Sequence, residues 1–524
     1  MTLNNIRVIL LVLKSRLKME GDFIMSNLKF GWAEIDLTPE KKISLAGQFA
    51  ERISEYVEKP ITATAMAVSS ENEQMVIVSC DILMLSANLV DLIREKLRNN
   101  TVGLLPEKVI MCAIHTHTGP GYTMKDRSRT VNNSKPIFLR LLPEGKKYVE
   151  KQNISNNPDI IKGDEALEFL AEKITKVTLE AWAQRKDGSF TNAFGRAPVG
   201  MCRRAVYSDG SAQMWGETNQ AVFSSLEGSS DTGIELMYVY DENNKLKGIV
   251  ANLACPAQCV QHRMFVSPDF WGEVKFLLRK HFGDDIFLLP LCSAAGDQCP
   301  VDIVRWVEPE SDVNDPNIDR KYPLKRKADP SMFDIKGMKL TGRRIANEII
   351  AVYDDGLDAP QENPEFIHNV HHMKLPLRRT TLEQINNAKK AIYDYLSKKD
   401  GDVDYNDAAK VQVHTGILER EELQNIQDVI DTEVHTVRLG TIAIATNPFE
   451  LFLDYGNQIK ARSHAEQTFL IQLACGAEGY LPTEKAEKGG HYSAFISGGL
   501  VGHEGGDQLV RETLENINNE LFPL

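Results

Sequence analysis

The chain has 524 residues, a formal net charge of −13, and fractions of 42% hydrophobic and 25% charged residues. These fractions are ordinary for a globular protein, and the acidic charge argues against a protein that tracks nucleic-acid phosphates, which needs a basic surface. A chain of this length is expected to form one large elaborated domain or a few smaller ones.

The first residues carry an apolar run, Ile6 to Leu13. The run is too short for a membrane span of about 20 residues, and no small-residue cleavage site follows it. Because Met25-Ser-Asn-Leu-Lys-Phe-Gly resembles a fresh N-terminus, we predict that residues 1–24 are a mis-called extension. No other stretch approaches membrane-spanning length, so we expect no integral membrane segment.

In chain order, short β-branched runs alternate with segments of helical spacing, which predicts an α/β fold without a linker between separate domains. Strands are predicted at 75–80, 108–114, 233–240, 248–254, 286–292, 435–445 and 469–474, and helices at 87–98, 166–184, 270–281, 333–353, 381–398 and 452–463. Residues 122–163 and 302–332 are polar and are predicted to be loops, the first near the functional site. The chain after 474 is expected to form a glycine-rich tail.

The cysteines indicate a reducing compartment. All eight are spread along the chain, and no C-x-x-C pair occurs. Several lie inside apolar runs, where a free cysteine behaves as a small hydrophobic residue. We therefore predict a cytoplasmic location.

Two histidines follow the predicted strand at 108–114, in His115-Thr-His-Thr-Gly-Pro-Gly121. In a strand, residues i and i+2 point to the same side, so His115 and His117 are expected to face one point. The glycines beside Pro120 end the strand and let the backbone approach a bound group. The pattern predicts either a metal or acid–base site, or two hydrogen-bonded histidines without a chemical role.

Further polar residues lie at predicted strand ends, where α/β proteins commonly build their sites. Taken singly, each has an ordinary structural explanation, such as Asp297 in a turn or Glu450 in the first turn of a helix. Together they offer nitrogen, sulfur and oxygen ligands suited to zinc, with an arginine to hold a carboxylate or a polarised carbonyl. The set comprises Arg203, Cys255, Cys259, His262, Asp297, Glu450 and Tyr480.

These segments resemble, in order, the motifs of the neutral/alkaline non-lysosomal ceramidases. His115 to Gly121 is similar to the motif H-T-H-[ST]-G-P-G of that family. Five more segments resemble family motifs: Gly31 to Pro39, Arg203-Arg204, Gly296 to Pro300, Pro448 to Glu450, and Tyr480 to Thr483. The resemblance implies a catalytic domain over residues 25–524, with a large mixed sheet, helices packed on the sheets, and no C-terminal β-sandwich module of the family.

The resemblance also implies a zinc ion held by His115, Glu450 and Tyr480, with His117 and Arg203 as catalytic residues. The family's second histidine ligand falls, by counting, on Cys255, and this is the main departure. Three alternatives follow. The Cys255 thiolate ligates Zn²⁺, which we favour; His262 supplies the nitrogen ligand; or the site has lost or changed its metal.

The predicted function is zinc-dependent hydrolysis of an amide bond in an N-acyl sphingoid or related N-acyl substrate. The metal would acidify a water, His117 would move protons, and Arg203 would bind the substrate or the tetrahedral intermediate. Rival hypotheses are a hydrolase of a small soluble ester, amide or sugar-derived substrate, a non-catalytic metal-binding relative, and a metal-independent hydrolase with Cys255 or Cys299 as nucleophile beside His262.

Overall fold

The computed structural model of the chain describes residues 28–48, 52–100, 103–125, 134–149, 157–305, 334–361 and 363–524. The predicted extension, residues 1–24, and most of the predicted loop at 302–332 lie outside the described residues.

A mixed sheet of eight strands forms the centre of the fold. Its strand order is β17-β15-β14-β9-β1-β5-β6-β7, with parallel pairing of β6 with β7 and of β15 with β17. The remaining neighbours pair antiparallel. The strands are β1 (Lys29–Asp36), β5 (Thr62–Ser69), β6 (Gln74–Cys80), β7 (Val109–Ala113), β9 (Lys186–Arg196), β14 (Gly233–Asp241), β15 (Leu246–Leu253) and β17 (Phe287–Cys292).

A second sheet of four strands packs against one face of the first. Its order is β19-β20-β21-β23, from β19 (Phe366–Pro376), β20 (Val429–Leu439), β21 (Ile442–Thr446) and β23 (Gln467–Ile471). The core between the sheets contains side chains from both, such as Trp32 and Met66 from the large sheet and Val437 and Phe469 from the small one. This apolar layer removes the facing sides of both sheets from water.

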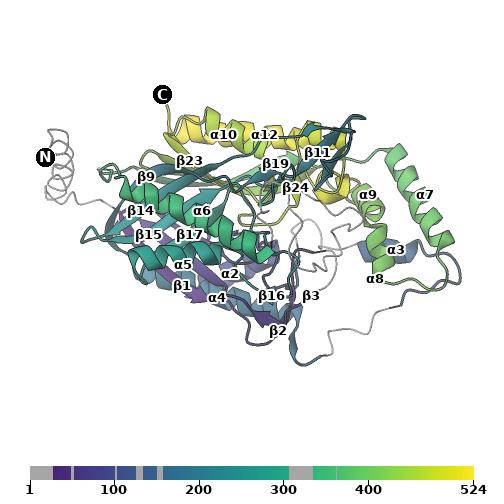
Figure 1. Cartoon of the computed structure of the whole chain (residues 1–524), viewed down its shortest axis with the longest axis horizontal. Helices are drawn as coiled ribbons and strands as arrows, with labels where there is room; N and C mark the ends of the chain where they lie inside the picture. Colours follow the sequence, from purple (N-terminus) through teal and green to yellow (C-terminus); the bar gives the residue numbers. More distant parts are fainter. Residues whose placement is uncertain are drawn as a thin grey trace.

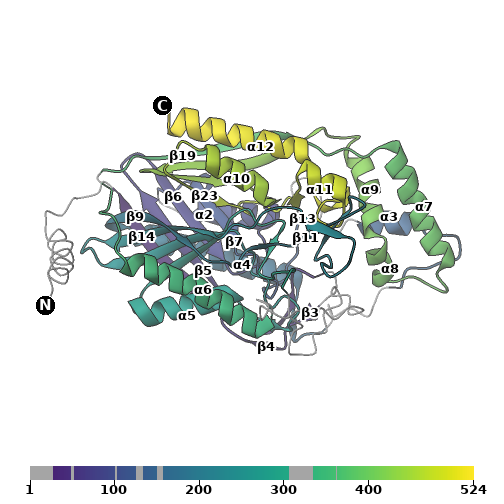
Figure 2. The same ribbon diagram turned by 45° about the horizontal axis from the view of Figure 1, so that its top comes forward.

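Helices cover the two outer faces, so the fold has four layers in the order helix, sheet, sheet, helix (Figures 1 and 2). The large sheet carries α2 (Ala87–Asn100) and α4 (Gly163–Ala183) over one half. Its other half carries α5 (Phe270–Phe282) and α6 (Asp334–Asp354). The small sheet carries α10 (Leu453–Arg462) and α12 (His503–Glu515), drawn in yellow-green and yellow.

A separate group of helices lies at one end of the layers in both views (Figures 1 and 2). It consists of α3 (Ser134–Arg140), α7 (Leu382–Lys398), α8 (Tyr405–Lys410) and α9 (Gln412–Leu423), which share a small apolar core. Thr381 begins α7 with a capping box, since its side chain accepts from the Gln384 N–H while the Gln384 side chain accepts from the Thr381 N–H.

The predicted α/β fold with a large mixed sheet and packed helices is confirmed. The predicted strand at 435–445 was wrong in its extent, because Gly440, with φ +61°, turns the chain between β20 and β21. The predicted glycine-rich tail was also wrong, since α12 occupies part of it. Two positions inside this helix have no room for a side chain and are glycines. A Cβ at Gly505 would come within 2.2 Å of Val501, and one at Gly506 within 2.4 Å of Tyr455. The predicted loop at 122–163 contains α3 and the short strand β8 (Ile160–Ile161).

A half-buried carboxylate joins the large sheet to α5. Glu34 on β1 lies 2.9 Å from Lys275 and 2.8 Å from Arg279. Burial alone would raise the pKa of Glu34, but the two cations outweigh it and lower that pKa to about 2. The ionised carboxylate therefore stabilises the fold above its unfolded pKa of 4.5, and this contribution is lost as the pH falls toward 2.

We expect Glu34→Gln to lower the free energy of unfolding at pH 7 by on the order of 3 kcal/mol. The difference from the wild type should shrink steadily below pH 4.5, in urea unfolding measured at several pH values. Glu242→Gln, which removes an exposed ion pair with Lys186, is the matched control and should change little. A difference for Glu34→Gln that is the same at pH 7 and pH 3 would contradict the assignment.

Candidate functional site

The site begins where β7 ends. The strand stops at Ala113, and the backbone then turns, with His115 at φ +64°, a left-handed conformation that costs energy for a residue other than glycine. The Nδ1 atom of His115 lies 2.9 Å from the Leu83 carbonyl oxygen. A carbonyl oxygen only accepts, so Nδ1 carries a proton and Nε2 is the ring nitrogen that faces the site.

His117 meets His115 as predicted, although a turn rather than a continued strand brings them together. Their Nε2 atoms lie 3.3 Å apart, and both side chains are buried. On its other side the His117 ring packs on Gly47, where a Cβ would come within 2.5 Å of the ring. Gly47 has φ +93°, so both its conformation and its lack of a side chain are needed here.

Glu450 and Tyr480 come from two short paired strands, β22 (Glu450–Leu451) and β24 (Tyr480–Leu481). The parallel register places these two residues opposite each other. Glu450 Oε2 lies 3.3 Å from His115 Nε2, and the Tyr480 hydroxyl is hydrogen-bonded to the Glu450 carboxylate. Burial would raise the pKa of Glu450, but the neighbouring His115 and Arg203 outweigh it and lower that pKa, so the group is a carboxylate at neutral pH.

Gly296, in the predicted Gly296 to Pro300 segment, allows the chain to pass close to Glu450. A Cβ at this glycine would come within 2.3 Å of the Glu450 carbonyl oxygen. The neighbouring Asp297 accepts from the backbone N–H of Leu453, 2.8 Å away, at the start of α10. Burial raises the pKa of Asp297 to about 6. This carboxyl group therefore anchors the helix that follows Glu450, and it is a structural member of the site.

Arg203 is buried beside the carboxylate. Its guanidinium donates to the Gly296 carbonyl oxygen at 3.0 Å and to Gln258 Oε1 at 3.1 Å. Gln258 Nε2 in turn lies 2.7 Å from His117 Nε2. Sequence reasoning missed Gln258, because an amide side chain between alanine and cysteine carries no signature of metal binding or proton transfer. The site thus joins His115, His117, Arg203, Glu450 and Tyr480, with Gln258 added.

Cys255 and His262 point elsewhere. The Cys255 Sγ lies 3.3 Å from the Val199 carbonyl oxygen, and burial raises the pKa of this thiol well above its usual range. His262 Nε2 lies 3.5 Å from Asp334 Oδ1, at the start of α6. The structure therefore brings neither side chain into contact with His115 or Glu450 through any hydrogen bond or ion pair of the described residues.

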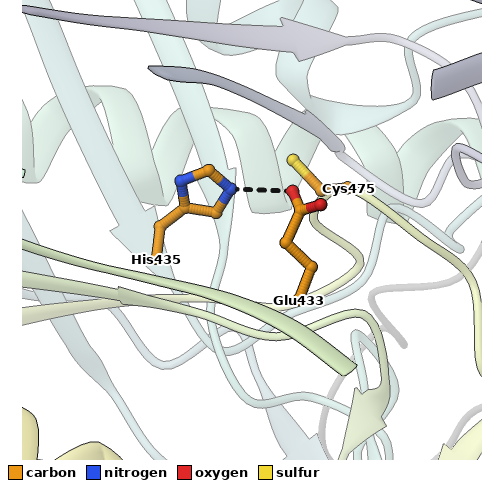
Figure 3. A group of neighbouring side chains, drawn as sticks. All are labelled: Glu433, His435 and Cys475. Carbon is orange, nitrogen blue, oxygen red and sulfur yellow. Dashed lines mark hydrogen bonds and ion pairs between the residues drawn. The ribbon is translucent and has the colours of Figure 1, made fainter. Parts of the chain in front are cut away.

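A second buried group of possible metal ligands lies between the layers, at Glu433, His435 and Cys475 (Figure 3). Within the described part of the chain, it is the one set of three His, Cys, Asp or Glu side chains with ligand atoms all within 4.8 Å of one another. However, Arg94 already binds both oxygens of Glu433, at 2.6 and 2.8 Å. Its Nη2 also lies 3.8 Å from the Cys475 sulfur. A cation thus already neutralises this group.

His115, Glu450 and Tyr480 are chemically suited to a zinc ion. His115 Nε2 and the Glu450 carboxylate lie 3.3 Å apart as a hydrogen-bonded pair, and a zinc ion would take the place of the proton between them. Tetrahedral zinc with bonds of about 2.0–2.1 Å separates its ligand atoms by roughly 3.3 Å, which agrees with this spacing. The phenol of Tyr480, which is hydrogen-bonded to the Glu450 carboxylate, would supply a third ligand.

Comparison with known proteins shows the fold. Neither the known protein-family profiles nor the curated protein sequences give a match. The crystal structure of neutral ceramidase from Pseudomonas aeruginosa is similar over 94% of this chain and 74% of that one, with a TM-score of 0.62 and 14% identity. A structure described as ceramidase complexed with C2 gives a TM-score of 0.62 and 12% identity, over 93% of this chain and 74% of the other. The predicted resemblance is therefore confirmed as a neutral ceramidase-like fold.

Proposed function

We propose that this protein is a zinc-dependent hydrolase that cleaves the amide bond of an N-acyl sphingoid or related N-acyl substrate. The observation that carries the proposal is the pairing of His115 Nε2 with the Glu450 carboxylate at 3.3 Å, with the Tyr480 hydroxyl beside them. The neutral ceramidase-like fold supports the amide substrate, because the compared structures are ceramidases.

His115, Glu450 and Tyr480 would hold the metal. Zinc supplies Lewis acidity, which makes a water molecule nucleophilic near neutral pH and polarises a carbonyl group. Burial of the Tyr480 hydroxyl, together with the nearby Glu450 charge, raises the pKa of this phenol when no metal is present. Tyr480 therefore keeps its proton at Glu450 until a cation takes that place.

His117 and Arg203 would serve the chemical step. The Nε2 atom of His117 faces the same point as His115 Nε2 and is placed to take a proton from the attacking water and pass it to the leaving amine. Arg203 holds a permanent positive charge in a buried position near Glu450 and Tyr480. There it would stabilise the negative oxygen of the tetrahedral intermediate.

The proposal uses neither Cys255, which the sequence favoured as the ligand at the family's second histidine position, nor His262, and it keeps the metal of the third alternative as zinc on His115, Glu450 and Tyr480. The Cys255 thiol donates to the Val199 carbonyl oxygen and, among the described residues, makes no hydrogen bond with His115 or Glu450, and burial raises its pKa. The same argument weakens the cysteine-nucleophile hypothesis, since burial also raises the pKa of Cys299, to about 12. The eight cysteines are buried free thiols, which agrees with the proposed cytoplasmic location.

A substrate panel tests the proposal. The zinc-loaded full chain is assayed with N-acyl sphingosines of short and long chain, small soluble N-acyl compounds, matched esters and acylated amino sugars, with release of the free amine or alcohol as the readout. We expect the highest kcat/KM for an N-acyl sphingoid. A preference for a soluble ester or sugar derivative would support the rival substrate class, and absence of any turnover would support a non-catalytic relative.

None of the helices in the described ranges is long and apolar enough to cross a membrane. An N-acyl sphingoid disperses poorly in water. The assay above is accordingly run with the lipid in mixed detergent micelles.

A further inference from the structure

The side chain of Gln258 connects the two residues to which we assign the chemical step. Its amide lies between the Nε2 atom of His117, at 2.7 Å, and the guanidinium of Arg203, at 3.1 Å. The side chain is 1% exposed. We propose that Gln258 is a positioning residue that orients the His117 ring and holds its proton on Nδ1.

The orientation of the amide follows from its partners. A guanidinium has only donors, so the group that faces Arg203 must be the amide oxygen. The amide nitrogen then faces His117 and donates to Nε2. A ring nitrogen that accepts a hydrogen bond carries no proton, so the proton of the neutral His117 ring is on Nδ1. If the amide were reversed, its NH2 group would face the N–H groups of the Arg203 guanidinium, and two donors would lie opposite each other.

Arg203 is itself held in place, so its guanidinium presents its donors to Gln258 in a fixed direction. Its Nη2 donates to the Gly296 carbonyl oxygen at 3.0 Å, and its guanidinium lies 5.7 Å from the Trp215 ring centre. Since Arg203 is 2% exposed, bulk solvent does not reach these contacts. Through Arg203 and Gln258, the Gly296 carbonyl thereby determines which ring nitrogen of His117 carries the proton.

The consequence is a difference between two otherwise identical imidazoles. The Leu83 carbonyl accepts from Nδ1 of His115, so the other ring nitrogen, Nε2, faces Glu450. In His117 the corresponding nitrogen, Nε2, accepts a hydrogen bond from the Gln258 amide. His115 Nε2 is therefore placed to bind a cation, while His117 Nε2 is kept unprotonated by the amide, which the attacking water would displace before giving up its proton. That assignment of roles rests on the proposed function, whereas the tautomer itself does not.

Gln258 also accounts for the departure at Cys255, three residues earlier. A cysteine side chain is shorter than histidine and turns here toward the Val199 carbonyl. The polar side chain that this segment sends to the site is Gln258 instead. The segment thus contributes an amide that orients its neighbours.

Nitrogen NMR of the metal-free full chain with ¹⁵N-labelled histidine tests the tautomer without any assay of activity. The His117 signals are assigned by their loss in His117→Gln. In the wild type we expect a protonated Nδ1 and an unprotonated Nε2. In Gln258→Glu both side-chain oxygens accept, so the proton of His117 should move to Nε2. In Gln258→Leu the single tautomer should be lost. Gln508→Leu, which changes an amide on α12, is the control and should leave the His117 signals unchanged.

A protonated Nε2 in the wild type would overturn the inference, and this needs no variant to fold. An unchanged His117 tautomer in Gln258→Glu would overturn it as well. With the best substrate, Gln258→Leu should reduce kcat about 10- to 100-fold and leave KM and zinc content near the wild-type values, as for other residues that orient a metal-site group. If the wild type turns nothing over, the proposed function fails while the NMR result still decides the role of Gln258.

Discussion

Glu450→Gln is expected to abolish stoichiometric zinc binding and to lower kcat by at least about a thousandfold, since bound zinc contributes several kcal/mol to the transition state. The substitution keeps the shape of the side chain and removes its charge. His115 Nε2 would then face a neutral amide instead of a carboxylate at 3.3 Å. The measurement is zinc content by mass spectrometry after dialysis, together with amide hydrolysis.

Cys255→Ser is the matched control for this experiment, because it alters a neighbouring buried side chain that points away from the site. It should retain one zinc per chain and most of the activity. Cobalt substitution adds a direct view of the ligands, since a thiolate ligand gives an intense charge-transfer absorption. Such a band in the wild type that disappears in Cys255→Ser would contradict our ligand assignment and restore the cysteine as a ligand.

Glu433→Gln is expected to lower the free energy of unfolding by about 3–5 kcal/mol and to leave zinc binding intact. The Glu433 carboxylate accepts hydrogen bonds from both terminal nitrogens of Arg94 and also lies 3.0 Å from His435 Nε2. Burial would raise the pKa of Glu433, but Arg94 and His435 outweigh it and lower that pKa. The substitution would leave the Arg94 cation, 5% exposed, without its counter-ion.

Denaturant unfolding and metal analysis on the same samples check this prediction. Glu168→Gln, which removes an exposed partner of Lys96 on the surface, is the control and should change the stability by less than about 1 kcal/mol. Loss of zinc in Glu433→Gln with zinc retained in Glu450→Gln would place the metal at Glu433, His435 and Cys475 and contradict the proposed site.

Much of the fold could be predicted where apolar runs were continuous. The buried strands β6 and β7 and the helix α2 follow directly from such patterns. Strand β9 was not predicted, because its segment, Lys186–Arg196, contains two glycines and several polar residues. Its place in the sheet is determined by pairing with β14 over nine residues, which no local pattern reveals.

The site was predictable to the extent that its residues have a chemical signature. His115, Glu450 and Tyr480 were found because a histidine pair, a strand-end acid and an ordered set of motifs stand out in a sequence. The direction of Cys255 and the part played by Gln258 were not accessible, since both depend on which side of a turn faces Arg203. The motif order indicated which segment contributes to the site. Only the packed structure shows that Gln258, and not Cys255, is the side chain of this segment that reaches it.

The most direct test of the central claim is inactivation of the full chain by two kinds of reagent. We predict that a strong chelator removes one zinc per chain and abolishes amide hydrolysis, that added Zn²⁺ restores both, and that thiol alkylation of the folded protein leaves activity intact. Activity that survives complete removal of the metal and is lost on alkylation would contradict the account and identify a cysteine hydrolase.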